Sequence, residues 1–400
     1  MRIAFLIERL DPTRGGAETY VSDFTARLAA EGHDVHVFSR SGSLSPAGVT
    51  LHPVPVTGLG RAMRTLSFAR NVERMLARHA HGGLASERFD VVQGTAWTWT
   101  QDVFQPHNGV YRAMLAARLR RRHGMGALCE RLGRRIGPKQ IVFRWIERAQ
   151  YVRRPAMLFI ALSRMVQRDM QTFYGLAAEK IELVYNGVDT ERFHPRNRET
   201  HRATVRARHG IGTDEVVFII VAQDFERKGV RQTVECVTEK LPPSRLLVVG
   251  RGRVEKLRPL AEARAPGRVI FTGAVADTAC YYAAADVCVL PTNYDPCSLV
   301  VLEALASGLP VITSTMNGAG ELMTHGKEGW IIGSSADRSF AASEHVTELA
   351  DSMHTLFEPT LRKKMGDAAR ALAEKHTLHH NYRRMMEVYE KVLKRKKPQC

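Results

Sequence analysis

Residues 290–314 read LPTNYDPCSLVVLEALASGLPVITS, and this stretch decides the fold. Its first residue completes a buried strand, 287–290, and a polar turn then leads into a helix expected to begin near Ser298 and end at Gly308. A second strand, 311–313, follows at once. A strand, a helix and another strand in this order predict a parallel α/β unit. The N-terminus of such a helix offers N–H groups and a partial positive charge to phosphate or to sugar hydroxyls.

Two carboxylates bracket the start of this predicted helix. Asp295 precedes it, and Glu303 lies eight residues further along. Because carboxylates accept hydrogen bonds from neutral hydroxyl groups, the pair suits a nucleotide sugar better than a bare nucleotide. The alternative for Glu303 is a carboxylate in the middle of a helix that faces solvent.

The same alternation of strands and helices runs through the whole chain and occurs twice. It predicts two doubly wound α/β domains, 1–185 and 214–376, joined by a polar linker at 186–213 and followed by a basic amphipathic helix at 377–400. The strands expected in the first domain are 3–7, 33–39, 91–93, 103–105, 158–162 and 181–185. Those expected in the second are 216–222, 246–249, 269–271, 287–290, 311–313 and 330–332.

Composition bounds the class of protein. The 400 residues are 44% hydrophobic and 25% charged, as in soluble globular proteins. No apolar run approaches the roughly 18 residues of a membrane-spanning helix, and the N-terminus lacks the pattern of a secretory signal. The six cysteines are scattered, so neither a disulfide framework nor a zinc site is indicated, and the cytosol is the expected compartment. The net charge of +17 calls for a polyanionic neighbour.

Further candidate residues follow other predicted strands. Gly15 and Gly16 come between the first strand and a helix, where glycine lets a ligand approach the backbone; an ordinary flexible turn is the alternative. Arg227 and Lys228 follow the strand 216–222, where two cations would neutralise a diphosphate as its charge develops; a solvated basic helix start is the alternative.

The stretch 290–314 resembles the acidic-x7-acidic motif of the retaining GT-B glycosyltransferases of family 4, and within them the branch of lipopolysaccharide core glucosyltransferases. The resemblance implies a GT-B fold: two doubly wound Rossmann-like domains facing a central cleft, with the C-terminal helix crossing back to the N-terminal domain. Asp295 would contact the transferred sugar and Glu303 the ribose. Asp replaces the common Glu, and Pro296 removes one N–H that a glycine would provide. The backbone N–H groups that remain as donors are those of Cys297, Ser298, Leu299 and Val300.

The resemblance extends to other loops. It places Gly15 and Gly16 near the donor phosphates, His107 near the donor sugar, and the loop of Val275 beside the nucleobase. Gly250 lies in a similar strand-end loop. The family usually has an arginine where this chain has Gln223, so Arg227 would have to serve as the second cation beside Lys228. Cys297 has no identifiable partner histidine, and a packed residue is expected there rather than a nucleophile.

The chain shows no pair of residues suited to a general base and nucleophile of a double displacement. Retaining GT-B enzymes are thought to use a front-face route, in which the leaving phosphate assists the incoming hydroxyl. Such a site needs cations and groups that hold the sugar. No DxD motif occurs in a suitable loop, so neither a metal nor another cofactor is expected.

A basic insertion interrupts the first domain at 111–154. Residues 112–154 contain thirteen Arg or Lys and only two Glu. Val142, Trp145, Ile146, Ala149 and Val152 share one helical face, while Arg144, Glu147, Arg148 and Tyr151 share another. Together with Arg120, Arg121 and Arg122, this pattern predicts contact with an anionic membrane. The alternative is a helix that packs its apolar face on the domain and solvates its charges.

These observations favour a hexosyltransferase that moves glucose from UDP-glucose to a lipid-linked saccharide, at the inner face of the cytoplasmic membrane. A mannosyltransferase using GDP-mannose and a UDP-sugar 2-epimerase of the same fold are alternatives. A binding protein for nucleic acid or lipid would explain the basic insertion but not the three matching loops, and nucleic acid is not an expected partner. Donor base, linkage position and oligomeric state are not readable from the sequence.

Overall fold

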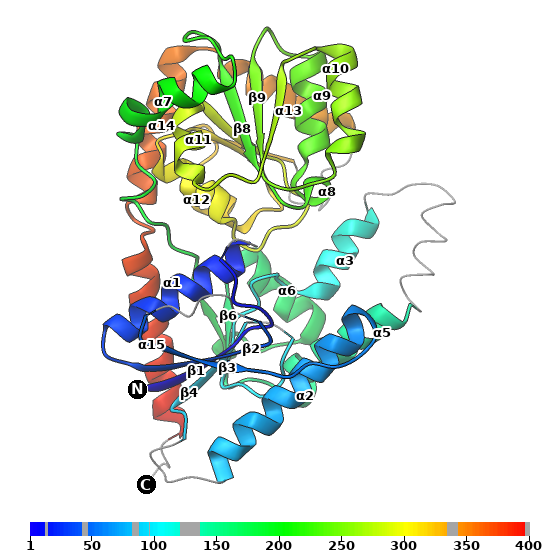
Figure 1. Ribbon diagram of the computed structural model, residues 1–400, viewed down its shortest axis with the longest axis vertical. Coiled ribbons are helices and arrows are strands. Elements are labelled where there is room, and N and C mark those ends of the chain that lie inside the picture. Colours follow the sequence, from blue (N-terminus) through cyan, green and yellow to red (C-terminus); the bar gives the residue numbers. More distant parts are fainter. Residues whose placement is uncertain are drawn as a thin grey trace. The chain divides into compact units, whose positions relative to one another are not determined.

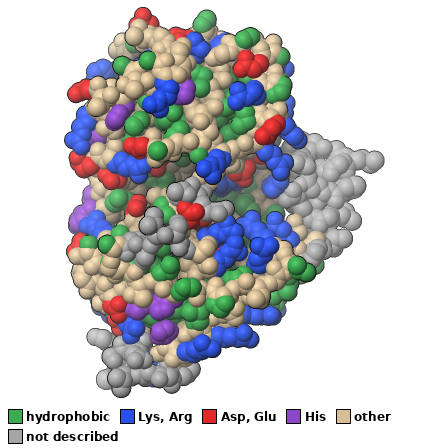
Figure 2. Space-filling model, in the orientation of Figure 1, with side chains coloured by type: hydrophobic (Ala, Val, Ile, Leu, Met, Phe, Trp, Pro, Cys, Tyr) green, Lys and Arg blue, Asp and Glu red, His purple; other side chains and the backbone are tan. Residues whose placement is uncertain are grey.

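The computed structural model describes residues 1–12, 15–41, 47–81, 88–95, 97–120, 137–333 and 343–396. The chain divides into two compact units (Figure 1). Unit 1 comprises Met1–Val184 together with Tyr382–Cys400, and unit 2 comprises Tyr185–Asn381. Lys and Arg side chains are spread over both units in Figure 2.

Unit 1 is built on a seven-stranded sheet in which every pairing is parallel, with the order β3-β2-β1-β4-β5-β6-β7. Its strands are β1 (Arg2–Leu6), β2 (Asp34–Ser39), β3 (Val49–Pro53), β4 (Val91–Gly94), β5 (Val103–Phe104), β6 (Leu158–Ala161) and β7 (Ile181–Leu183). The helices before the domain boundary are α1 (Gly16–Ala30), α2 (Gly60–His81), α3 (Tyr111–Arg120), α5 (Pro138–Arg148) and α6 (Arg164–Tyr174).

The C-terminal helix α15 (Leu378–Lys396) runs into unit 1, and its side chains contact the first sheet. The Tyr389 hydroxyl donates to Oε1 of Gln93 inside the core. Lys391 pairs with Glu182 at 2.6 Å, and Lys396 pairs with Asp102 at 2.7 Å. The predicted return of the C-terminal helix to the N-terminal domain is therefore confirmed.

Unit 2 repeats the architecture with a six-stranded parallel sheet in the order β10-β9-β8-β11-β12-β13. Its strands are β8 (Val217–Val221), β9 (Arg245–Val249), β10 (Val269–Gly273), β11 (Val287–Leu290), β12 (Val311–Ser314) and β13 (Gly329–Ile332). Its helices are α7 (Asn197–Arg208), α8 (Phe225–Lys228), α9 (Val230–Glu239), α10 (Arg258–Arg264), α11 (Thr278–Ala284), α12 (Leu299–Ala306), α13 (Ser343–Thr355) and α14 (Pro359–Ala373).

The predicted doubly wound fold is confirmed, with one strand, β3, that the sequence reading missed. β3 is an edge strand whose side chains are half-buried or exposed, so it lacks the continuous apolar run of a buried parallel strand. In both sheets the strand order reverses beside the first strand of the unit, between β1 and β4 and between β8 and β11. Ligands of open parallel sheets bind beyond the carboxyl ends of the strands at such switch points.

The expected linker at 186–213 is wrong as a description of this segment, because it contains α7 and forms part of unit 2. Three of the four arginines of α7 converge on one buried carboxylate, Asp286. Arg202 and Arg206 reach it at 2.6 and 2.8 Å, and Arg198 lies at 4.0 Å. Arginines rather than aliphatic residues anchor this helix, and its polar composition therefore looked like that of a linker.

The expected faces of the basic insertion are only partly correct. Ile146 and Ala149 are buried against Ala69 and Trp99, whereas Trp145 and Val152 are exposed. Glu147, expected on the polar face, is buried and accepts hydrogen bonds from the backbone N–H groups of Tyr111 (2.5 Å) and Arg112 (3.2 Å).

Tyr151, also expected on the polar face, is buried too and stacks on Phe159 and Tyr174. Glu147 thus anchors the start of α3 to α5, and burial raises the pKa of its carboxyl to about 7.

Arg121 and Arg122 lie outside the described residues, as does the side chain of Arg120. Among the described residues, no helix combines the length and apolar character needed to cross a membrane.

Candidate active site

The switch point of unit 2 brings Lys228 and Asp295 into contact. Lys228 ends the short helix α8 after β8, and Asp295 lies in the loop after β11. The Lys228 ammonium donates to Oδ2 of Asp295, and the two side chains are only 12% and 9% exposed. Burial lowers the pKa of Lys228, and the charge of Asp295 acts in the opposite direction. The sequence therefore places a buried cation and a carboxylate where a parallel sheet binds its ligand.

Glycine explains how α8 comes this close to the neighbouring strand. Gly229 follows Lys228 with φ +77°, and a Cβ there would lie 2.4 Å from the carbonyl oxygen of Pro291. The two segments are also hydrogen-bonded, because the carbonyl of Arg227 accepts from the Asn293 backbone N–H (2.8 Å) and the Thr292 hydroxyl (3.1 Å). No side chain fits at position 229 without moving these segments apart. Sequence reasoning missed this glycine's role, although it directly follows the candidate lysine.

The loop that carries Asp295 is held by the segment after β12. The Asp295 N–H donates to the Met316 carbonyl (2.9 Å), and the Asp295 carbonyl accepts from Gly318 (2.8 Å). Asn317, which the sequence reading did not single out, lies between these residues and accepts a hydrogen bond from the Ser298 N–H (3.4 Å). These bonds fix Asp295 from its backbone, so its position does not depend on Lys228 alone.

Cys297 is buried in the same loop. Its carbonyl accepts from the side-chain amide of Asn186 at 2.8 Å, and burial raises the pKa of its thiol to about 12. The thiol is therefore protonated at neutral pH, as expected of a packed residue.

Helix α12 follows this loop, with Ser298 as its N-cap. The N–H groups of Leu299 and Val300 are in the first turn, where a helix provides no carbonyl partner. We therefore expect them to serve as donors to ligand oxygens at the same end of the sheet as Asp295.

Glu303 lies on α12 and is partly buried, so it is not a carboxylate that simply faces solvent. Its Oε2 accepts a hydrogen bond from the Tyr282 hydroxyl at 2.9 Å. Burial raises the pKa of Glu303, while this hydrogen bond and the charges of Arg192 and Lys228 act to lower it. Lys228 thus pairs with Asp295 and also acts electrostatically on Glu303. Tyr282 comes from the preceding helix α11, and no motif in the sequence pointed to it.

Arg227, the expected second cation, lies next to Lys228 but is turned toward other groups. Its Nη1 donates to the Tyr294 carbonyl at 3.4 Å, and its Nε is 3.6 Å from Oδ2 of Asp224. Asp224 is the N-cap of α8 and accepts from the Arg227 N–H at 3.1 Å. The guanidinium therefore lies along the same loop as Asp295, half-buried rather than fully solvated.

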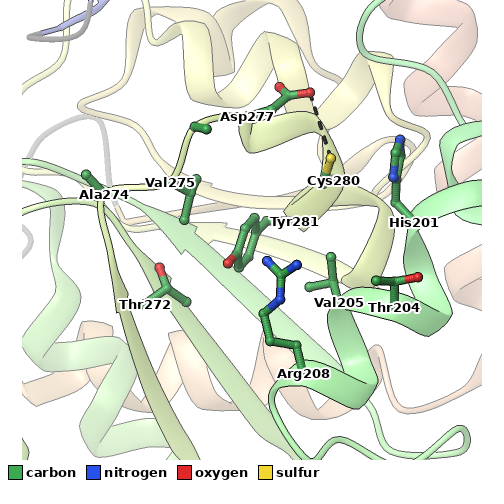
Figure 3. A pocket seen from close by; sticks show the side chains of 11 residues that line it. His201, Thr204, Val205, Arg208, Thr272, Ala274, Val275, Asp277, Cys280 and Tyr281 are labelled. Carbon is green, nitrogen blue, oxygen red and sulfur yellow. Dashed lines mark hydrogen bonds between the residues drawn. The ribbon is translucent and has the colours of Figure 1, made fainter.

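The remaining candidates of unit 2 lie after β9 and β10. Gly250 has φ +119°, and a Cβ there would lie 2.0 Å from the Ala222 carbonyl, so close strand packing alone requires glycine. Val275 lines a cavity of about 400 Å³ between α7, β10 and α11 (Figure 3). Val275 and Tyr281 point toward it in Figure 3, as does the guanidinium of Arg208. Sequence reasoning singled out the loop of Val275, but it interpreted α7 as linker and therefore missed the lining residues on that helix, which include Arg208.

In unit 1, Gly15 is the N-cap of α1 and Gly16 is its first residue. His107 follows β5, with its ring centroid 4.6 Å from that of Tyr20 on α1. Its Nε2 is buried and has no hydrogen-bond partner in the part of the chain that the structure describes. Burial lowers the pKa of His107 to about 3, so the imidazole is neutral at physiological pH. A neutral ring with an unused nitrogen is suited to hydrogen bonding rather than to carrying charge.

Among the described residues, no cluster of three His, Cys, Asp or Glu side chains has a geometry that would hold a metal ion.

Comparison with known proteins gives two family matches. Residues 14–192 match the model of Glycosyltransferase Family 4, and residues 215–354 match that of Glycosyl transferases group 1. The chain is 25% identical over 348 residues to the lipopolysaccharide glucosyltransferase WaaG of Escherichia coli (strain K12), covering 83% of this chain and 85% of that protein. It is 29% identical over 234 residues to the sulfoquinovosyl transferase SQD2 of Arabidopsis thaliana, covering 57% of this chain but only 43% of that protein. A crystal structure of WaaG superposes with a TM-score of 0.80 at 23% identity and covers 97% of this chain and 99% of the other.

Proposed function

We propose that this chain transfers glucose from UDP-glucose to a lipid-linked saccharide such as the lipopolysaccharide inner core, with retention of configuration. The proposal starts from the finding that the chain is a nucleotide-sugar-dependent glycosyltransferase of the GT-B fold and resembles lipopolysaccharide core glucosyltransferases. The observation that carries the proposal is the buried Lys228–Asp295 pair at the β8/β11 switch point, with Glu303 beside it. This grouping offers a cation to a diphosphate and carboxylates to sugar hydroxyls within one unit.

Each side chain has a role in this reaction. Lys228 and the first-turn N–H groups of α12 hold the leaving diphosphate, whose negative charge grows as the bond to the sugar breaks. Asp295 accepts hydrogen bonds from hydroxyls of the transferred hexose, and Glu303 accepts them from the ribose. His107, neutral at physiological pH, can donate or accept one hydrogen bond to a bound sugar through its Nε2.

The transfer itself follows a front-face route. The bond between the anomeric carbon and the diphosphate breaks, and the acceptor oxygen forms its bond to that carbon on the same face. The proton of the acceptor hydroxyl goes to the departing phosphate oxygen. No side chain is needed as a general base, and positive charge is the main requirement of such a site.

The choice of glucose and of a lipid-linked acceptor is supported by the similarity to the lipopolysaccharide glucosyltransferase WaaG of Escherichia coli, 85% of which is covered. Calorimetry with UDP-glucose, UDP-galactose, UDP-N-acetylglucosamine and GDP-mannose tests the donor. We expect UDP-glucose to bind at least 10-fold more tightly than the others, which corresponds to about 1.4 kcal/mol. Transfer assays with cell-envelope lipid extracts then test the acceptor.

Preference for GDP-mannose would favour the mannosyltransferase alternative. Conversion of the free donor to its C2 epimer without an acceptor would favour the epimerase. Binding of none of the nucleotide sugars would contradict the proposed function.

We also propose that α5 and the segment after it contact an anionic membrane. Ile141, Trp145 and Val152 are 50%, 41% and 48% exposed, although each is a large apolar side chain. The guanidinium of Arg153 lies 5.9 Å from the centroid of the Trp145 ring. Exposed apolar side chains among arginines are typical of helices that lie in the membrane interface.

Flotation with phosphatidylglycerol-containing vesicles tests the membrane contact. Replacing Arg144, Arg148 and Arg153 by glutamine is expected to lower the partition coefficient by about 10-fold or more, at roughly 1 kcal/mol for each lost charge near the surface. The matched control replaces three exposed lysines of unit 2, Lys363, Lys364 and Lys375, by glutamine. Equal losses of vesicle binding in both triple variants would show that binding depends only on net charge, and would contradict a specific membrane-contact surface.

A further inference from the structure

A cavity of about 440 Å³ lies at the other switch point, that of unit 1. Its walls come from the loops that follow β1, β2, β4 and β5 and from the first turns of α1 and α2. This is the β1/β4 position at which a parallel sheet binds a ligand, independently of the Lys228 site in unit 2. The residues lining it are Ile7, Glu8, Arg9, Ala17, Glu18, Arg40, Arg61, Arg64, Thr95, Trp97 and Asn108.

Four arginines from three separate segments line this cavity. Arg9 follows β1, Arg40 follows β2, and Arg61 and Arg64 are on the first turns of α2. Only two carboxylates, Glu8 and Glu18, are among the lining residues, so four positive charges face two negative ones. The lining therefore has a net charge of +2. In Figure 2, Lys and Arg side chains are concentrated on unit 1 between the segments that Figure 1 labels α1 and α5.

The arginines differ in how far a neighbouring carboxylate already neutralises their charge. Arg40 pairs with Glu8 at 3.3 Å and is 16% exposed. Arg61 and Arg64 are exposed, and the guanidinium of Arg61 lies 5.8 Å from the Phe143 ring centroid. Arg40 and Arg64 also line a second cavity of about 440 Å³ beside the segment 53–56. Arg40 and Arg64 thus have open space on both sides, which leaves room for a negatively charged ligand.

Neutral side chains of the same cavity suit a saccharide. Asn108 supplies an amide that can hydrogen-bond sugar hydroxyls, whereas the buried Thr95 hydroxyl already donates to the Leu6 carbonyl (3.0 Å) and can only accept. Trp97 provides an aromatic ring whose orientation is set by contacts with Tyr111 and Phe143, at centroid distances of 5.4 and 4.6 Å. Guanidinium groups bind phosphate through paired hydrogen bonds in a fixed geometry.

We infer that this cavity binds a phosphate group carried by the saccharide acceptor, with Arg61 and Arg64 as its principal ligands. The inference rests on the proposed function, because it names a chemical feature of the acceptor. The charged group adds affinity and orients the acceptor before transfer, while the donor is held by residues of unit 2.

Calorimetry on the full-length chain with mannose 6-phosphate, mannose and inorganic phosphate tests this site. We expect mannose 6-phosphate to bind at least 10-fold more tightly than mannose, with an affinity that falls as salt is raised. Replacing both Arg61 and Arg64 by alanine is expected to weaken its binding by about 10- to 100-fold. The matched control is the double variant Arg70→Ala/Arg78→Ala, which removes two exposed arginines from the same helix outside the cavity. It should bind mannose 6-phosphate like the wild type.

Equal weakening in both double variants, or equal binding of mannose and mannose 6-phosphate, would overturn the inference. So would a selective loss of phosphatidylglycerol-vesicle binding in the Arg61/Arg64 variant without any effect on mannose 6-phosphate, because the arginines would then serve a lipid headgroup. UDP-glucose is titrated into the wild type in parallel. Failure of that titration would count against the proposed function, whereas a failure confined to mannose 6-phosphate would count only against the phosphate site.

Discussion

Replacing Lys228 by methionine is expected to lower kcat/KM for sugar transfer by about 10³-fold or more, since removing one preorganised donor from a charge-stabilising site costs roughly 10²–10³ in rate and this donor carries a full charge. Methionine keeps most of the length and apolar stem of lysine but cannot neutralise a diphosphate. The loss should appear mainly in kcat, because the charge on the leaving group is largest in the transition state. Steady-state transfer measured with the best donor from calorimetry checks the result.

The same substitution leaves Asp295 buried without its cation. Breaking a buried ion pair by removing one partner costs about 3–5 kcal/mol of stability, so a loss of activity could reflect unfolding. The double variant Lys228→Met/Asp295→Asn removes both charges and is expected to recover most of the unfolding free energy while remaining inactive. Urea unfolding of both variants separates these effects.

Lys240→Met provides a matched control, because Lys240 is an exposed lysine at the end of the adjoining helix α9. It should retain transfer within about twofold of the wild type, as surface substitutions generally do. Near-normal turnover by a folded Lys228→Met variant would contradict the assignment of Lys228 to the diphosphate.

The agreement between sequence and structure was best where side-chain periodicity reports burial. The buried strands of both sheets, including β8 and β11, are continuous runs of apolar residues, because parallel strands are covered on both faces. The sequence reading missed β3 and α7 because neither shows such an apolar run. β3 is a half-exposed edge strand, and α7 is fixed by arginines on Asp286 instead of by aliphatic packing.

The sequence predicted the site residues that lie close together in the chain, but not the contacts between distant segments. Asp295, Ser298 and Glu303 lie on one strand–turn–helix, so their spacing alone placed them at one end of the sheet. Tyr282 and Asn317 reach the site from other elements through side-chain hydrogen bonds, and a hydroxyl or amide has no periodic signal. The cluster Arg9, Arg40, Arg61 and Arg64 is scattered through the first 64 residues, and only the β1/β4 switch point brings it together.

Glu303→Gln is expected to weaken binding of the nucleotide-sugar donor by roughly 10- to 100-fold, because hydrogen bonds to a charged group are worth about 1.5–3 kcal/mol. A carboxylate accepts from two ribose hydroxyls at once, whereas the amide of glutamine has a single acceptor oxygen. The effect should appear in Kd for the donor and in KM more than in kcat, since the ribose does not react. Calorimetry with UDP-glucose measures it, and Glu262→Gln on the exposed face of α10 is the matched control.

The environment of Glu303 adds a pH dependence with a definite sign. Burial raises the pKa of Glu303, so in the free enzyme the carboxyl holds its proton to a higher pH than an ordinary glutamate. Only the ionised form accepts both hydroxyls, and donor affinity should therefore rise with pH as Glu303 loses its proton, then level off. The pH dependence due to this group should be absent from Glu303→Gln.

Tyr282→Phe distinguishes a positioning role from a merely structural one. The Tyr282 hydroxyl donates to Glu303 at 2.9 Å and favours the ionised carboxylate. Its removal should raise the pKa of Glu303 further, so the rise in donor affinity should move to higher pH while the plateau changes little. A uniform loss of affinity at every pH would indicate that Tyr282 only packs against α12. An unshifted profile in Tyr282→Phe, together with full donor affinity in Glu303→Gln, would remove Glu303 from the donor site and leave the Lys228–Asp295 pair to hold the nucleotide sugar alone.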